Sequence, residues 1–243
     1  MIKVEICIAC DELEAMEADV DAAFEGGAAT VELCSRMDVG GLTPEIDFIR
    51  AARAAFPRDG VMVMIRPRAG GFTYSLDEIL TMQRQIHWAA AAGADGVVMG
   101  ILDADGRLAQ APLAELVALA RSLGLQASIH RAFDDAGDPF EALETAIELR
   151  CDRILTAGTP YQADIPAVAG IAQLHDLILH AEDRIEIVIG GGVNAENVGL
   201  ILRDAPPAGK LAVHAFSGVR VGAVVDVERV RALRTAAKRA VLR

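Results

Sequence analysis

Two short motifs place a glutamate and a cysteine two residues apart. Residues 4–7 read VEIC and residues 31–34 read VELC. Side chains alternate between the two faces of a strand, so Glu5 shares a face with Cys7. The same spacing places Glu32 on one face with Cys34. Thiolates bind soft metal ions and carboxylates carry protons, so the motifs predict either a metal site or an acid–base catalytic site.

The cysteines admit two interpretations. Cys7 and Cys10 form a C-x-x-C spacing, which is common in metal and redox sites but is nonspecific by itself. Cys7 and Cys34, on neighbouring strands, could form a low-coordinate thiolate site of the kind that suits Cu(I). Cysteine also packs as a small buried hydrophobe, and we expect Cys151 to be structural. The candidate metal ligands are therefore Cys7 and Cys34, and the candidate ion is Cu(I).

Basic and imidazole side chains follow two later strand-like runs. Arg66 and Arg68 flank a proline ahead of two glycines, and two guanidinium groups can hold a carboxylate or a phosphate. His130 ends another run, and Asp134 could orient it as a general acid or base. The alternatives are that the arginines only neutralise glutamates and that His130 is a hydrogen-bonded core residue.

Two further loops contain candidate anion ligands. Gly191 and Gly192 precede a predicted helix, and His214 and Ser217 end the last strand-like run and begin the loop after it. Exposed amides at a helix N-terminus bind anions. A tight turn would use the same glycines without binding anything. We expect these four residues to take part in binding an oxyanion.

The elements that must position these residues form a regular series. Short apolar runs alternate eight times with longer amphipathic runs, which is the pattern of repeated βα units. The predicted strands are residues 3–8, 29–34, 61–66, 96–101, 126–130, 153–157, 185–190 and 211–215. The predicted helices are residues 11–25, 44–56, 75–92, 112–123, 138–149, 163–181, 195–203 and 226–240.

Eight such units in 243 residues match the size of a TIM barrel. We predict an α/β fold, a single (β/α)8 TIM barrel, over residues 1–243. Barrel active sites lie at the C-terminal ends of the strands. Glu5, Glu32 and His130 should therefore meet at one mouth. Buried carboxylates there would need an arginine, a metal ion or a proton as partner.

Composition limits the classes of partner. The net charge of −12 repels nucleic acid and anionic lipid. No run reaches the roughly 20 apolar residues that cross a bilayer, and the N-terminus has no secretory pattern. We therefore expect a cytoplasmic protein with reduced thiols, which binds neither nucleic acid nor a membrane.

Several motifs together resemble those of the CutC copper-homeostasis family. They are VEIC, VELC with Gly40-Gly41-Leu42-Thr43-Pro44, Ile65-Arg66-Pro67-Arg68, His130-Arg131-Ala132-Phe133-Asp134, Arg153-Ile154-Leu155-Thr156 and Gly190-Gly191-Gly192. The resemblance runs in order over nearly the whole chain. It implies a (β/α)8 barrel, a cytoplasmic location and self-association as a homodimer or homotetramer. Where Cu(I) binding is proposed for the family, cysteines of the early strands are invoked, and Cys7 and Cys34 match them.

The chain departs from the family pattern in two places. Ala69-Gly70-Gly71-Phe72 stands where the family usually has Gly-Gly-Asp-Phe, which removes a carboxylate from the mouth. The loop after His214 is shorter than usual. Three hypotheses follow: a CutC-like protein of copper homeostasis that binds Cu(I), an enzyme with lyase- or isomerase-type acid–base chemistry, or a noncatalytic barrel that acts as a binding or scaffold protein. In the second, the substrate is a small oxyanionic or sugar-like molecule at the mouth.

Overall fold

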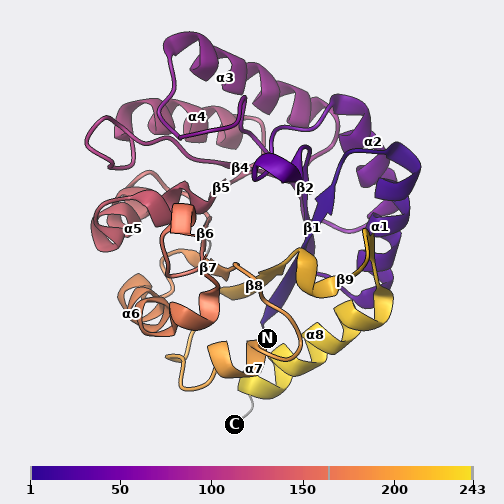
Figure 1. Cartoon of the computed structure of the whole chain (residues 1–243). Coiled ribbons are helices and arrows are strands. Elements are labelled where there is room, and N and C mark those ends of the chain that lie inside the picture. The colour runs from indigo at the N-terminus through magenta and orange to yellow at the C-terminus, as the bar shows by residue number, and fades with distance from the viewer. Residues whose placement is uncertain (1, 164, 242–243) are drawn as a thin grey trace.

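Eight parallel strands close into a barrel surrounded by helices (Figure 1). The computed structural model describes residues 2–163 and 165–241. Each strand pairs with the next in sequence, and the last pairs with the first. The strands are β1 (Lys3–Ala9), β2 (Thr30–Cys34), β3 (Val61–Met64), β4 (Gly96–Met99), β5 (Gln126–Ile129), β6 (Arg153–Thr156), β7 (Glu186–Ile189) and β8 (Leu211–Ala215). The predicted (β/α)8 barrel is confirmed.

The helices lie outside the barrel, one after each strand (Figure 1). They are α1 (Leu13–Gly26), α2 (Ile46–Ala55), α3 (Leu76–Ala91), α4 (Gln110–Ser122), α5 (Pro139–Glu148), α6 (Ile171–Ala181), α7 (Val198–Ile201) and α8 (Val227–Val241). A two-stranded hairpin, β9 (Arg220–Val221) and β10 (Val224–Val225), precedes α8. No helix within the described ranges is long and apolar enough to cross a membrane.

Side-chain caps fix the start of two helices. At α3, Ser75 accepts a hydrogen bond from the amide of Glu78, whose carboxylate accepts one from the amide of Ser75. At α5, Asp138 caps two amides, and Pro139 fills the first helical position, where no amide donor is needed. Caps of this kind contribute about 1 kcal/mol each. Both starts agree with the sequence-based prediction.

Two predicted helices are shorter than expected. The helix expected over 163–181 begins only at Ile171, since the residues just before it form a separate 3-10 turn, Ala167–Ala169, that follows Pro166. Residue 164 lies outside the described residues. The helix expected over 195–203 is reduced to α7. There the side-chain oxygen of Asn194 accepts from the amides of Glu196 and Asn197, and such local bonds compete with helix formation.

Alternation along the strands separates two apolar regions. Side chains such as Ile6, Ile8 and Leu33 face the helices and belong to the main core. The side chains between them face the barrel interior, where Leu155, Val188 and Ala212 form a small cluster of their own. The interior is otherwise rich in polar, charged and sulfur-containing side chains, and the strands carry these to one mouth.

Candidate functional site

A cavity of about 310 Å³ opens at the C-terminal ends of the barrel strands. Its volume lies at the small end of the range found for ligand pockets, about 300–1,000 Å³. Most of the predicted site residues line it, namely Cys7, Glu32, Cys34, Arg66, His130, Gly191, Gly192, His214 and Ser217. The strands therefore bring together residues that lie up to 210 positions apart in sequence.

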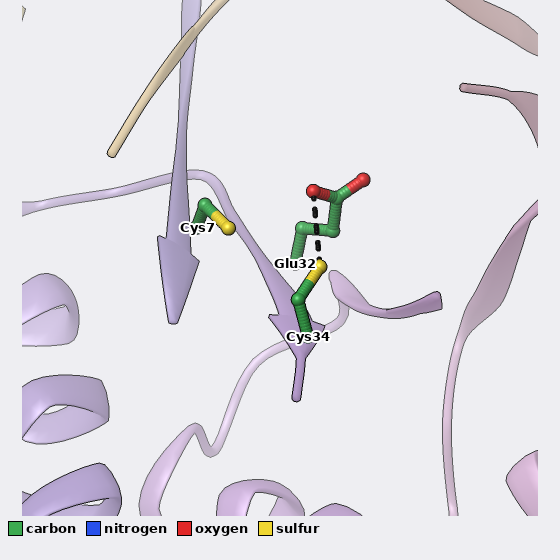
Figure 2. Close-up of side chains that lie close together, drawn as sticks. All are labelled: Cys7, Glu32 and Cys34. Carbon is green, nitrogen blue, oxygen red and sulfur yellow. Dashed lines mark hydrogen bonds between the residues drawn. The ribbon is translucent and has the colours of Figure 1, made fainter. Parts of the chain in front are cut away.

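Sulfur atoms gather on the side of the cavity formed by β1 and β2. Cys7 pairs in register with Glu32, which places Cys34 two residues further along the neighbouring strand. One ligand atom from each of these three side chains lies within 4.8 Å of the others (Figure 2). The Cys7 Sγ is 3.9 Å from the Met37 Sδ, and Met64 packs in the same group. We call Cys7, Cys34, Met37 and Met64 the sulfur cluster.

The two thiols of this cluster have different acidities. Interaction with Cys34 is the largest cause that lowers the pKa of Cys7 to about 6, and His214 adds to the effect against burial. The pKa of Cys34 is raised, first by Cys7 and then by burial. The Cys34 Sγ is 3.6 Å from the Glu32 carboxylate, to which it donates a hydrogen bond (Figure 2). The pair thus gives up its first proton easily and holds the second.

A layer of charged residues lies in the barrel interior next to the cavity. Arg153 Nη1 donates to Glu5 at 2.7 Å, and its Nε lies 2.7 Å from a Glu186 oxygen. Lys3 pairs with the other Glu186 oxygen at 2.8 Å, and Thr30 donates to Glu5. We call Glu5, Arg153 and Glu186 the ionic layer. Glu5 is therefore a buried partner of Arg153, and it does not line the cavity.

His214 connects the ionic layer to the cavity. Its Nδ1 is 3.0 Å from Glu5 Oε1, and its Nε2 is 3.8 Å from Glu32 Oε2. Burial disfavours the imidazolium, but Glu32, Cys7 and Glu5 outweigh it and raise the pKa of His214. Burial raises the pKa of Glu32 to about 8, against the attraction of His214. Burial also acts on Glu5, but Arg153 and His214 prevail and lower its pKa.

Arg66 and His130 lie on a different wall of the cavity. Arg66 Nη1 donates to the carbonyls of Val39 and Gly41 at 3.0 and 3.1 Å, and its Nη2 donates to Gly70 at 2.7 Å. It does not neutralise the glutamates, as the sequence had left open. Instead, it forms no ion pair with any carboxylate in the described ranges.

His130 is buried, and one of its ring nitrogens is already engaged. Nδ1 accepts a hydrogen bond from the Ala132 amide at 3.0 Å. Burial and then the charge of Arg66 lower the pKa of His130 to about 3. The ring is therefore neutral near pH 7, with its proton on Nε2. In this state it can donate a hydrogen bond, but it is a weak base.

Two expected contacts are not formed. The carboxylate of Asp134 does not orient His130, because Arg131, Thr156 and the Ala157 amide engage both of its oxygens. Arg68 points away from the cavity and pairs with Glu78 at the start of α3.

The C-x-x-C spacing forms no joint site either. The Cys10 thiol lies near the Ile8 carbonyl at 3.9 Å, outside the sulfur cluster, and burial raises its pKa. Cys151 is buried outside the cavity, and its pKa is raised to about 12 by burial.

The glycine loop lines the cavity without lying at a helix N-terminus. Gly191 and Gly192 have φ values of 95° and 74°, which favour glycine. The short helix α7 begins several residues later, and the Gly192 carbonyl accepts from the Asn197 side chain. The helix-terminal anion site expected here is therefore not formed.

Sequence reasoning missed several residues of the interior. Arg153 and Glu186 begin apolar strands, and each shares a face with the next inward residue, Leu155 or Val188. A charged side chain in that alternation could have revealed the ionic layer. Met37 could not be found in this way, because it lies in a short 3-10 helix after β2, outside the strand alternation.

Comparison with known proteins places the chain in a family. The sequence model of the CutC family matches residues 2–219. A family protein CutC of Vibrio vulnificus is 44% identical over 196 residues, which is 81% of this chain and 74% of that protein. The corresponding protein of Pasteurella multocida is 37% identical over 203 residues, covering 84% and 78%.

Solved structures agree with this placement. A copper homeostasis protein CutC from Streptococcus agalactiae superposes with a TM-score of 0.75 at 30% identity, covering 88% of this chain and 98% of that one. A structure described as native KDPGal has a TM-score of 0.69 at only 16% identity, over 99% and 96% of the two chains. The second likeness shows the barrel fold alone.

Proposed function

Since the chain belongs to the CutC family, we propose that it acts in copper homeostasis by binding Cu(I) at the sulfur cluster. The observation that carries the proposal is the approach of Cys7 and Cys34 on adjacent strands. Thiolate and thioether sulfurs are the ligands that Cu(I) prefers. Met37, at 3.9 Å from Cys7, and Met64 are candidates for a third, weaker ligand.

The acidities of the two thiols favour binding. A thiol must lose its proton before it binds a metal ion, so proton competition weakens affinity. The lowered pKa of Cys7, about 6, leaves one thiolate available near pH 7. His214, in its imidazolium form, lies close enough to stabilise that thiolate. Cu(I) itself then displaces the second proton, from Cys34.

Titration of the reduced protein with Cu(I) against a competing chelator tests this proposal. The Cys7→Ser/Cys34→Ser variant should lose far more than the 10- to 100-fold in affinity that loss of an outer-shell partner typically costs. Met37→Leu and Met64→Leu should each have a smaller effect. Cys10→Ser is the matched control, because this buried thiol lies outside the cluster. Unchanged affinity in the double variant would refute the thiolate site.

The arrangement around His214 favours a second candidate function, acid–base chemistry on a small molecule. A buried imidazole lies between two glutamates whose pKa values are moved in opposite directions, and Glu32 lines the cavity. Pairs of this kind distinguish acid from base in many enzymes. A thermal-shift screen of small metabolites tests the candidate, since a ligand at 100 times its Kd stabilises by about 2.7 kcal/mol. The candidate function would be supported by a stabilising ligand that the parent protein converts chemically and the Glu32→Gln variant does not.

A further inference from the structure

We infer that the wall formed by Arg66, His130 and Phe72 binds the carboxylate group of a small organic acid. All three residues line the cavity, and each is at least 95% buried. The inference concerns binding only, so it rests neither on Cu(I) nor on a catalytic role for the cavity.

The first support is an unpartnered donor. Nδ1 of His130 accepts from a backbone amide, so the proton of the neutral ring is on Nε2. Nε2 has no hydrogen-bond partner in the described part of the chain, although the side chain is only 3% exposed. A buried donor without an acceptor is destabilising, and an oxygen atom of a ligand would supply the missing hydrogen bond.

The ring is also held firmly in place. A Cβ at position 100 would lie 2.7 Å from the ring Cε1, so Gly100 lets the imidazole pack directly against the end of β4. The Phe72 ring lies on the imidazole, with centroids 4.9 Å apart. Nε2 itself is covered, so the side chains around it must shift before a ligand atom can reach it.

The second support is the charge of Arg66. Its guanidinium lies 5.0 Å from the Phe72 ring centroid, so the aromatic ring is a neighbour of both Arg66 and His130. Carbonyl oxygens engage the guanidinium, but they do not neutralise it. The other lining arginine, Arg131, is paired with Asp134 at 2.6 Å. The cationic charge near His130 therefore lacks an anion.

The charge balance indicates a monoanion. Arg66 contributes one uncompensated positive charge, and His130 contributes a neutral donor. His214 already has the Glu5 carboxylate at 3.0 Å. A singly charged carboxylate would complete this balance, whereas a phosphate dianion would exceed it. The apolar side chains of Met64 and Leu155 line the same cavity and can contact the carbon body of the acid.

Calorimetry on the full chain without copper tests the inference. The probes are pyruvate and benzoate, each with its neutral amide, pyruvamide or benzamide, and inorganic phosphate. At least one carboxylate should bind in the millimolar range or better, and it should bind at least tenfold more tightly than its amide and than phosphate. If neither carboxylate binds, or if the amides bind equally well, the inference is wrong.

Matched variants assign the binding to the two residues. His130→Asn can still accept the Ala132 amide but lacks the distal donor, so affinity should fall about 10- to 100-fold. His130→Gln keeps an N–H near the Nε2 position and should retain more of it. Arg66→Lys should weaken binding, whereas Arg68→Lys, outside the cavity, should not.

A spectroscopic measurement covers the case of a variant that folds poorly. In the parent protein, the imidazole ¹⁵N spectrum should show His130 neutral with its proton on Nε2, and the carboxylate should shift the Nε2 resonance. An unshifted Nε2 resonance at saturation would overturn the assignment. Arg66→Lys should leave Cu(I) affinity intact, so failure here is distinguishable from failure of the copper proposal.

Discussion

Arg153 and Arg66 are both buried in this barrel, but only one of the two guanidinium groups is paired with carboxylates. Arg153 lies between Glu5 and Glu186, with both contacts at 2.7 Å. Arg66 is equally buried, but its guanidinium donates its hydrogen bonds to backbone carbonyls. A closed ion-pair network has no need of a ligand, whereas an unpaired cation beside a cavity does. Burial alone therefore does not distinguish a structural arginine from a ligand-binding one.

The largest effect should come from breaking the closed network. Arg153→Met removes the guanidinium that Glu5 and Glu186 share and leaves them only His214 and the exposed Lys3 as cationic partners. The free energy of unfolding should therefore fall by about 3–5 kcal/mol. Chemical denaturation measures this loss. In a Glu5→Gln/Glu186→Gln background, Arg153→Met should lower the free energy of unfolding clearly less, since no uncompensated carboxylate remains. Equal losses in the two backgrounds would show that the ion pairs contribute nothing specific.

Arg66→Met should act on His130 instead. Burial and Arg66 together lower the pKa of His130 to about 3. Without Arg66 the pKa should rise, while burial keeps it below the ordinary value of about 6.5. An NMR titration of the imidazole measures the change, and an unmoved pKa would mean that the Arg66 charge does not reach the ring.

This pKa also predicts how stability depends on pH. The unfolded chain takes up the His130 proton at about pH 6.5, but the native chain does so only near pH 3. The contribution of neutral His130 to the free energy of unfolding is therefore fully present above about pH 6.5 and is lost as the pH falls towards 3. Between pH 7 and pH 4, the free energy of unfolding measured by denaturation should fall less steeply in His130→Asn than in the parent.

The smallest effect should come from the exposed edge of the ionic layer. Lys3 pairs with Glu186 at 2.8 Å, but the lysine side chain is 57% exposed. Such pairs typically contribute about 0–1 kcal/mol. Lys3→Met should therefore lower stability by no more than this, and added salt should reduce the difference. A loss as large as that of Arg153→Met would place Lys3 inside the network.

The barrel could be predicted from periodicity, because a strand is recognised by the local alternation of its side chains and a helix by its amphipathic face. The same alternation placed Cys7, Glu32 and Cys34 at the cavity. It could not show which cation each glutamate meets, because those contacts depend on the closed register of the barrel. Arg68 illustrates the limit: one residue beyond Pro67 its direction is set by the loop, and it turns to Glu78.

Closure of the barrel has a consequence for the order of assembly. His214 contacts Glu5, 209 residues earlier, and it does so only because β8 pairs with β1. A nascent chain that has not yet released β8 from the ribosome lacks the imidazole that stabilises the Cys7 thiolate. The pKa of Cys7 would then lack the part of its lowering that His214 contributes. The site proposed for Cu(I) would therefore be complete only at the end of folding.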